Sequence, residues 1–168
     1  ELTDNVKRLL EGHNIEIIHG TARLAGPDRV EIAPSDPNSK KGKDLSLQAR
    51  AIILATGGEP VSPSGLAFDG QHLISSREAL TLDSVPKHLG IVGGGYIGLE
   101  LGSVWLRLGA KVTVIEMLPK IATGLDGQVG RKLQRILKRQ GMRFMMQTKV
   151  TAAKISRNSV CVDLETKK

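Results

Sequence analysis

Apolar positions in the second half of the chain follow two different periods. Short apolar runs occupy residues 89–92, 111–115 and 142–146, and the stretches between them carry apolar residues at helical spacing. Those helical positions are Ile97, Leu101, Val104 and Leu108 in the first stretch, and Val129, Leu133, Ile136 and Leu137 in the second. Apolar strands joined by amphipathic helices are typical of a parallel sheet covered by helices. The pattern predicts a Rossmann-like βαβαβ unit of the α/β class, followed by a β-hairpin from Val150 onward.

The first half of the chain carries shorter elements. We predict a helix over residues 2–11, strands over 15–18, 29–32 and 45–49, a turn over 20–24 and a solvated loop over 34–43. Residues 51–55 are all apolar and predict a strand that leads into Thr56-Gly57-Gly58. Ser75, with Glu78 three residues later, indicates the cap of a short helix.

These elements divide the chain into three predicted parts. Residues 1–58 are interpreted as the C-terminal part of one nucleotide-binding domain, because they hold an apolar strand but no glycine-rich turn of their own. Residues 59–86 are predicted to be a linker, since prolines and glycine open this stretch. Residues 87–168 are predicted to form a truncated second domain, whose third strand lacks later neighbours and leaves an exposed edge.

A glycine-rich turn with G-x-G-x-x-G spacing follows the first apolar run. Gly93 permits the tight turn, Gly95 lets the backbone approach a pyrophosphate, and Gly98 lets the helix lie close to the strand. Free N–H groups at the start of that helix favour phosphate. The alternative is a glycine-rich turn without a ligand. The strand before the motif and the helix after it favour a dinucleotide.

Glu116 ends the second apolar run. It lies near the place of the acidic residue that dinucleotide-binding folds carry about 20 residues after the glycines. A carboxylate there accepts hydrogen bonds from the adenosine ribose hydroxyls and repels a 2′-phosphate. The predicted ligand is therefore NAD rather than NADP.

The composition excludes several other classes of function. The 168 residues are 40% apolar and 24% charged, which are ordinary globular values. The net charge of +7 comes from dispersed residues, with no cluster beyond Lys40-Lys41-Gly42-Lys43, so we expect no nucleic-acid partner. Cys161 is the only cysteine, and the four histidines have no metal-ligand spacing. No apolar run approaches the roughly 20 residues of a membrane span. We expect no membrane association and a location in the bacterial cytoplasm or the mitochondrial matrix.

The chain resembles the pyridine nucleotide–disulfide oxidoreductases, and within them the dihydrolipoamide dehydrogenases. The resemblance covers nearly the whole chain and is most specific at residues 93–105. The segments that carry it are residues 52–57, 75–80, 85–87, 93–105, 108–116, 133–137 and 140–141.

The resemblance implies roles for particular positions. Residues that match the NAD fingerprint are Gly93, Gly94, Gly95, Tyr96, Ile97, Gly98, Leu99 and Glu100, with Glu116 on the ribose. Val150 matches a position whose backbone lies near the adenine. Ala22, Thr56, Gly57 and Gly58 match positions that contact FAD. Glu100 matches an acidic residue that lies near the flavin and pairs with a lysine of the redox-disulfide helix, which this chain does not contain.

The resemblance also implies an activity. Family members of this kind are homodimers that oxidise dihydrolipoamide, carried on a lipoyl-bearing acyltransferase complex, and reduce NAD through a redox disulfide and FAD. This chain carries neither the FAD-binding glycine turn, nor a cysteine pair, nor the histidine–glutamate base, so we expect no catalytic residue and no turnover from it alone. We interpret it as an internal fragment. The alternatives are a fragment of a related flavoprotein disulfide reductase or soluble transhydrogenase, a free-standing NAD-binding module, and a purely structural role.

Overall fold

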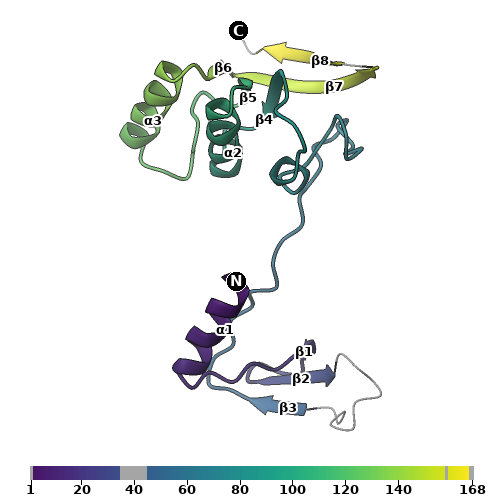
Figure 1. Ribbon diagram of the computed structural model, residues 1–168, viewed down its shortest axis with the longest axis vertical. Helices are drawn as coiled ribbons and strands as arrows, with labels where there is room; N and C mark the ends of the chain where they lie inside the picture. The colour runs from purple at the N-terminus through teal and green to yellow at the C-terminus, as the bar shows by residue number, and fades with distance from the viewer. Residues whose placement is uncertain (1, 35–44, 158, 167–168) are drawn as a thin grey trace. The chain divides into compact units, whose positions relative to one another are not determined.

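The computed structural model describes residues 2–34, 45–157 and 159–166. They form two compact units, residues 1–57 and residues 58–168, which we call unit 1 and unit 2 (Figure 1). Residues 35–43 of the predicted loop lie outside the described residues.

Unit 1 is a helix and a small antiparallel sheet. The helix α1 spans Leu2–Gly12, as predicted. The strands β1 (Gly20–Leu24), β2 (Arg29–Pro34) and β3 (Leu45–Gln48) pair in that order. The turn predicted over residues 20–24 is wrong, because this segment is strand β1 and pairs with β2 in full register. Ile32 is the one buried apolar side chain among the described residues of the unit.

Two predicted strands of unit 1 do not form. Residues 15–18 and 51–55 have no regular secondary structure. Ile53 and Leu54 are 89% and 67% exposed, although their pattern indicated a buried strand. An apolar segment becomes a strand only where a neighbour satisfies its backbone groups. Within the described part of the chain no strand pairs with either segment, so apolar composition alone gave a wrong prediction.

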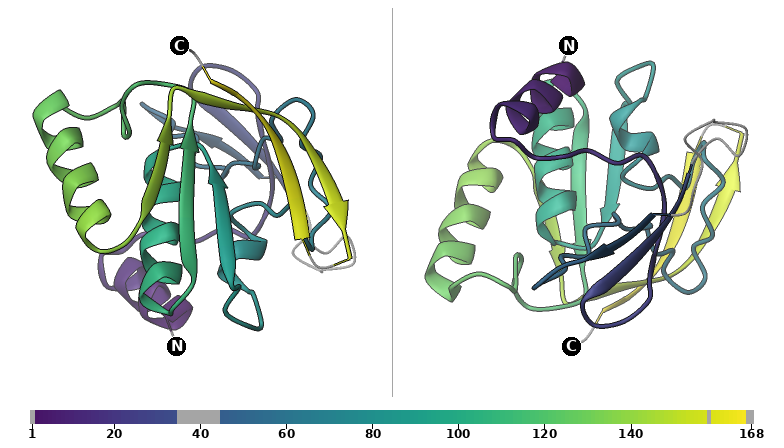
Figure 2. Two further views of the ribbon diagram at one scale, coloured as in Figure 1. Left: turned by 90° about the horizontal axis from the view of Figure 1, so that it is seen from above. Right: turned by 90° about the horizontal axis from the view of Figure 1, so that it is seen from below.

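Unit 2 is built on a parallel sheet. The strands β4 (His88–Val92), β5 (Lys111–Glu116) and β6 (Arg143–Met146) pair in the order β4-β5-β6 (Figure 2). The helices α2 (Tyr96–Arg107) and α3 (Gly127–Arg139) connect them. The antiparallel strands β7 (Thr148–Ser156) and β8 (Ser159–Thr166) form the predicted hairpin. The α/β fold class and its βαβαβ order are confirmed.

Both faces of the central strand β5 are buried, each in its own cluster. Val112 and Val114 face α2 and α3, where Leu99, Trp105 and Leu137 pack against them. The opposite face presents Ile115, which packs with residues of the 60s loop and of the hairpin, namely Leu66 and Val150. Successive side chains of a strand point to opposite faces. The continuous β-branched run of β5 therefore fits a strand that is covered on both sides.

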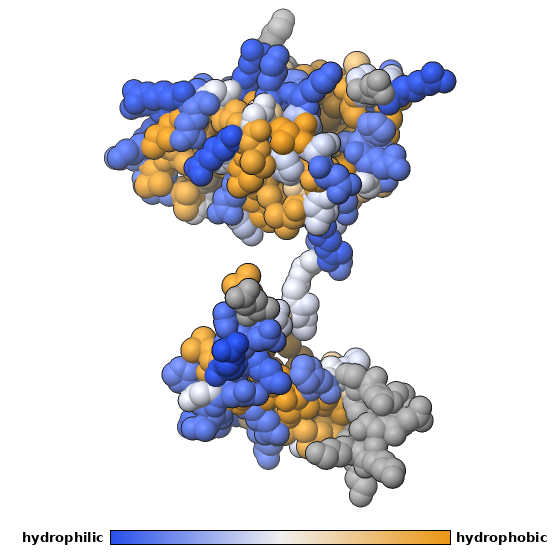
Figure 3. Space-filling model, viewed as in Figure 1, coloured by the Kyte–Doolittle hydropathy of each residue, from blue (hydrophilic) through white to orange (hydrophobic). Residues whose placement is uncertain are grey.

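The buried face of α2 differs from the predicted one. The predicted stripe included Ile97, Val104 and Leu108, but these side chains are 48%, 50% and 55% exposed. The residues that pack on the sheet are Leu99, Gly102 and Trp105. A β-carbon at Gly102 would lie 2.7 Å from Cδ1 of Ile91, so the missing side chain lets the helix approach the sheet on this face. The space-filling view shows hydrophobic residues exposed between hydrophilic ones on unit 2 (Figure 3).

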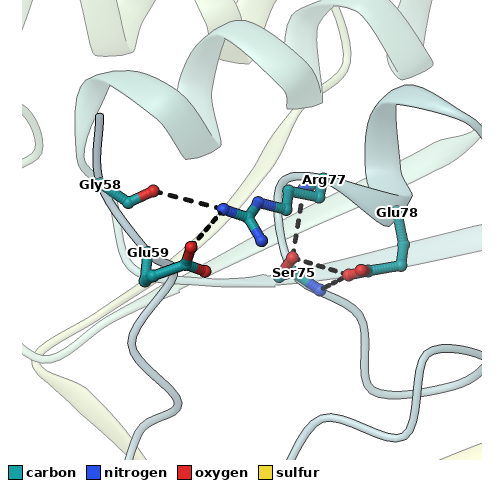
Figure 4. A network of polar contacts seen from close by, with 5 residues as sticks. All are labelled: Gly58, Glu59, Ser75, Arg77 and Glu78. Atoms are coloured by element: carbon teal, nitrogen blue, oxygen red, sulfur yellow. Dashed lines mark hydrogen bonds and ion pairs between the residues drawn. The ribbon is translucent and has the colours of Figure 1, made fainter. Parts of the chain in front are cut away.

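A short polar network holds residues 58–80 in place (Figure 4). The predicted helix here is one 3₁₀ turn, η1 (Glu78–Leu80). The Ser75 N–H and hydroxyl both donate to Oε2 of Glu78, at 2.7 and 2.6 Å. These two bonds, the hydroxyl bond first, lower the pKa of Glu78 below its ordinary value. The Arg77 guanidinium donates to Glu59 at 2.8 Å, which ties the start of the segment to its end.

Trp105 joins this segment to the core. Its indole Nε1–H donates to the carbonyl oxygen of Ala79 at 3.0 Å, and both residues are buried. Residues 59–86, predicted as a linker, fall within unit 2, and Ala79 of this segment contacts α2 through Trp105. No helix in the described part of the chain is long and apolar enough to cross a membrane.

Candidate functional site

The glycine-rich turn between β4 and α2 has the backbone geometry that its spacing predicts. Gly93 has a φ of +105°, which only glycine adopts without strain. Its N–H donates to the carbonyl oxygen of Ile115 at 2.8 Å, so the turn starts directly at the carboxyl end of the sheet. Gly95 is the N-cap of α2, and no side chain caps the helix there. The first-turn N–H groups of α2 therefore remain available to an anion.

Glu116 is fixed against this turn. Its side chain is 8% exposed. Oε2 accepts the Gly94 N–H at 2.6 Å, and Oε1 accepts the Leu118 N–H at 2.7 Å. Each carboxylate oxygen has two acceptor sites. One site on each oxygen is thus occupied by the backbone, and the second can accept a hydroxyl of a ligand.

The loop after Glu116 closes the other side of the turn. The Ala122 N–H donates to the Gly94 carbonyl oxygen at 2.8 Å. A β-carbon at Gly94 would lie 3.0 Å from Cγ2 of Ile121 and 3.3 Å from Oε2 of Glu116. A side chain at position 94 would therefore force the Ile121 side chain or the Glu116 carboxylate to shift by a few tenths of an ångström.

The other two motif glycines differ in their surroundings. A β-carbon at Gly98 would lie 2.8 Å from the Gly93 carbonyl oxygen and 2.9 Å from Cγ2 of Ile91, so this position sets the distance between helix and strand. A β-carbon at Gly95 would meet nothing within 4 Å. The fold itself does not need a glycine at position 95. A ligand that approaches the backbone there would explain it.

A cavity in unit 2 opens beside this turn. It has a volume of about 480 Å³ and is bounded by the turn and β4 on one side and by residues 60–76 on the other. Its apolar wall includes Pro60, Val61, Phe68 and Leu73. Sequence reasoning missed this wall, because the segment was read as a linker and its apolar residues have no helix or strand period.

The remaining predicted NAD positions are placed as follows. Tyr96 is 72% exposed and Ile97 is 48% exposed, and both line the cavity. Glu100 is exposed on α2. The side chain of Leu99 is buried in the core, and so is that of Val150, which packs on Ile115. A ligand could therefore contact Leu99 or Val150 only through the backbone.

The predicted FAD positions lie at the surface. Ala22 is in β1 and is paired with Ile32. Thr56, Gly57 and Gly58 are exposed and have no regular secondary structure. Gly57 has a φ of +84°, and a β-carbon at Gly57 or at Gly58 would meet nothing within 4 Å. The stretch leaves room for a close backbone contact.

Sequence reasoning found the motif residues but missed the groups that hold them. The Leu118 N–H supports Glu116, and the Ala122 N–H and the side chain of Ile121 support Gly94. These contacts are made by main-chain atoms or by an ordinary isoleucine, so no residue type signals them in the sequence.

Comparison with known proteins identifies the family. A profile described as pyridine nucleotide-disulphide oxidoreductase matches residues 1–168. The chain belongs to this family. The resemblance drawn from the motifs is thereby confirmed.

Relatives named as dihydrolipoyl dehydrogenases match almost the whole chain. Dihydrolipoyl dehydrogenase 3 of Pseudomonas aeruginosa is 48% identical over 164 residues, which cover 98% of this chain and 34% of that protein. The mitochondrial dihydrolipoyl dehydrogenase of Dictyostelium discoideum is 41% identical over 165 residues, covering 98% and 33%. The chain spans about a third of the length of these relatives.

Solved structures confirm the fold. LpdA from Mycobacterium tuberculosis aligns with a TM-score of 0.71 over 96% of this chain and 35% of that one, at 21% identity, which supports the fold alone. The HOCl-induced flavoprotein disulfide reductase RclA from Escherichia coli aligns with a TM-score of 0.66 at 27% identity, covering 97% and 36%.

Proposed function

We propose that residues 87–168 bind NAD, with the pyrophosphate on the turn at Gly93–Gly98 and the adenosine ribose on Glu116. The observation that carries the proposal is the pair of bonds from the Gly94 and Leu118 N–H groups to the carboxylate. They orient the side chain before any ligand arrives, and they leave acceptor capacity for two hydroxyls. The open space at Gly95 and the uncapped start of α2 fit the phosphates.

We further propose that the chain is the NAD-binding part of an FAD-dependent dihydrolipoyl dehydrogenase. The names of its relatives and their 48% and 41% identity support this assignment. NAD and FAD, when bound, would supply hydride and electron transfer, while the protein supplies binding and orientation. In this chain, Ala22, Thr56, Gly57 and Gly58 would contact FAD, and the exposed Glu100 would face the flavin side.

Partners and location follow from the same assignment. The intact enzyme would be a homodimer acting on dihydrolipoamide carried by an acyltransferase complex, in the bacterial cytoplasm or the mitochondrial matrix.

A second candidate is another flavoprotein disulfide reductase, favoured by the likeness to the Escherichia coli reductase at 27% identity. The two candidates would share the proposed NAD site and differ in the substrate, which is a dithiol for the first and a disulfide for the second.

Calorimetric titration of the chain with NAD tests the site. Glu116→Ala should weaken NAD binding about 10- to 100-fold, since hydrogen bonds to a charged group contribute about 1.5–3 kcal/mol. The NAD affinity of Glu116→Gln should lie between those of the wild type and of Glu116→Ala, because the amide keeps one acceptor oxygen. The wild-type preference for NAD over NADP should shrink in both variants, because the charge that repels the 2′-phosphate is gone.

The exposed carboxylate of Glu165 on β8 provides the control. Glu165→Ala removes one negative charge from unit 2 and should leave NAD affinity unchanged. Absence of NAD binding by the wild-type chain at millimolar concentration would contradict the proposal. Equal NAD affinity of Glu116→Ala and the wild type would also contradict it.

A further inference from the structure

The positive charge of the chain is concentrated in and around α3. Residues 107–149 contain ten lysines and arginines but only two acidic residues, Glu116 and Asp126, which gives a net charge of +8. All other residues together carry a net charge of −1. Both acidic side chains already accept backbone N–H groups, Glu116 beside the glycine-rich turn and Asp126 at the N-cap of α3. The charge that looked dispersed in the sequence therefore belongs to one segment of unit 2.

The helix α3 places five of these cations on one face. It contains no acidic residue, and all five cationic residues are exposed. At about 100° per residue they fall within an arc of about 120°. This arc lies opposite the buried residues Gly130 and Leu137. We call the five residues the α3 basic face: Arg131, Lys132, Arg135, Lys138 and Arg139.

The α3 basic face is not neutralised within the described part of the chain. None of the ion pairs among the described residues includes a residue of α3. Arg135 lies four residues from both Arg131 and Arg139, a spacing at which like charges destabilise a helix. Solubility alone is served by a surface of mixed sign. An unbalanced face that costs the helix stability therefore points to a ligand outside the chain.

Two exposed apolar side chains border the α3 basic face. Val129 and Ile136 are 52% and 43% exposed. They lie seven residues apart on one side of the helix, and Lys132 lies between them at i, i+3 and i, i+4 spacing. Phosphate groups of a nucleic acid would use the cations and leave these apolar side chains in water. A protein segment with both carboxylates and apolar residues would cover both kinds of side chain.

A small cavity lies at the beginning of the α3 basic face. Its volume is about 230 Å³, and Lys120 and Arg131 are among the residues that line it. Nη1 of Arg131 lies 3.4 Å from the position of a β-carbon at Gly127, and Nζ of Lys120 lies 3.9 Å from the same point. Asp126 also lines the cavity, but its Oδ1 accepts two N–H groups of α3. The cavity is smaller than the roughly 300–1,000 Å³ of small-molecule pockets and suits a single carboxylate side chain.

We propose that the α3 basic face binds an acidic, amphipathic helical segment of another protein. Carboxylates of that segment would pair with Arg131, Arg135 and Arg139, which follow one another at about 6 Å and can each hold a carboxylate by two hydrogen bonds. Its apolar residues would cover Val129 and Ile136. The 13 residues of α3 are about 20 Å long, so the contact is small and the association is weak and salt-dependent. This partner goes beyond the proposed function, which assigns no role to α3.

Fluorescence anisotropy with a labelled peptide tests the proposal on the 168-residue chain. The peptide is helical and carries glutamates at i, i+4 spacing and two leucines seven residues apart on the adjoining side. The chain should bind it with a Kd in the micromolar range at about 50 mM salt, and about tenfold more weakly at about 0.5 M salt. A peptide of the same composition in scrambled order should bind at least about fivefold more weakly, because its charges and leucines do not share a face.

Three variants separate a defined surface from net charge. Arg135→Glu should weaken peptide binding at least about tenfold, because it reverses the centre of the α3 basic face. Arg157→Glu, exposed at the tip of the β7–β8 hairpin, makes the same change of net charge and should weaken binding less than about twofold. Ile136→Ser should weaken binding about threefold. The urea midpoint of Arg135→Glu should not fall, because glutamate replaces two like-charge pairs by opposite-charge pairs.

Four results would overturn the proposal. Equal affinity for the ordered and the scrambled peptide, or equal losses in Arg135→Glu and Arg157→Glu, would show that net charge alone acts. Tighter binding of a short DNA duplex, or of phosphatidylserine vesicles, would identify a different class of partner. A lower urea midpoint of Arg135→Glu would show that the cation already has a partner within the chain. NAD affinity of Arg135→Glu, which should equal that of the wild type, reports separately on the proposed function.

Discussion

Two glycines of the same turn, Gly95 and Gly98, have opposite surroundings at the position of a β-carbon. Gly98→Ala should lower the free energy of unfolding by about 1–3 kcal/mol, because its methyl group would overlap the Gly93 carbonyl oxygen and Ile91. Gly95→Ala should leave unfolding unchanged within about 0.5 kcal/mol, since the space is open and its φ of −76° suits alanine. Chemical denaturation of both variants measures this difference.

The same pair separates folding from binding. If the pyrophosphate contacts the backbone at position 95, Gly95→Ala should weaken NAD binding by more than about tenfold, that is 1.4 kcal/mol, while the stability stays intact. Titration of the folded variant with NAD checks this. Unchanged NAD affinity in Gly95→Ala would argue that the open space serves no ligand.

The carboxylate of Glu78 makes the stability of unit 2 depend on pH. Hydrogen bonds from Ser75 lower the pKa of Glu78 from its ordinary value of 4.5. A group whose pKa is depressed in the folded state contributes stability above its unfolded pKa and loses that contribution as the pH falls through the folded pKa. The contribution should therefore be complete at pH 7 and be lost below about pH 4.5.

Urea titrations at pH 7 and pH 3, followed by the fluorescence of the single tryptophan, test this dependence. Glu78→Gln should lower the midpoint at pH 7 and reduce the difference between the two pH values. Glu165→Gln, at an exposed position, should leave that difference as in the wild type. An equal pH difference in Glu78→Gln and the wild type would show that other carboxylates set the acid response.

At the scale of single residues, the sequence predicted the glycine-rich turn but not the groups that support it. Gly93, Gly98 and Glu116 could be found because their residue types are unusual at those positions and each has a physical reason. The Leu118 N–H and the side chain of Ile121 hold Glu116 and Gly94 equally directly. They could not be found, because any residue has an N–H and isoleucine is common in cores.

Among the elements, α2 depends on one buried hydrogen bond to the segment before β4. Trp105→Phe removes the indole N–H and leaves the buried Ala79 carbonyl oxygen without its partner. The free energy of unfolding should fall by about 1–3 kcal/mol, as it does for an unsatisfied buried group. Leu108→Ala at the exposed C-cap of α2 is the control and should cost less than about 0.5 kcal/mol. Thermal unfolding followed by circular dichroism measures both, and equal losses would contradict this account.

The elements also show where the hydrophobic pattern succeeds and where it fails. The strands of unit 2 were predicted because β5 is rich in β-branched residues and because glycines mark the ends of the neighbouring helices. The buried face of α2 was mispredicted because apolar residues occur on most sides of the helix. The helix packs on the sheet through Gly98 and Gly102, and a pattern of apolar side chains does not include glycines. The strand predictions for residues 15–18 and 51–55 were wrong because a strand requires a partner strand. The hydrophobic pattern of one segment does not tell whether such a partner is present.

For the whole molecule, the distribution of buried side chains indicates unequal stability of the two units. Ile32 is the one buried apolar side chain in the described part of unit 1, whereas unit 2 has two clusters, around Val114 and Ile115. Small domains with little buried apolar surface are marginal. Amides of β2 should therefore exchange at least about 100-fold faster than those of β5 under native conditions, because unit 1 opens at lower free energy.

Two core substitutions decide whether the units open separately. Ile32→Ala removes the buried side chain of unit 1 and should speed exchange in β2 while leaving β5 unchanged. Val114→Ala makes a cavity where the side chain has no exposed surface, and should speed exchange in β5 by lowering the stability of unit 2 alone. If either substitution accelerates exchange in both strands equally, the two units unfold together. The stability of unit 1 would then depend on unit 2. In that case the few buried side chains of unit 1 would not make it open at a lower free energy than unit 2.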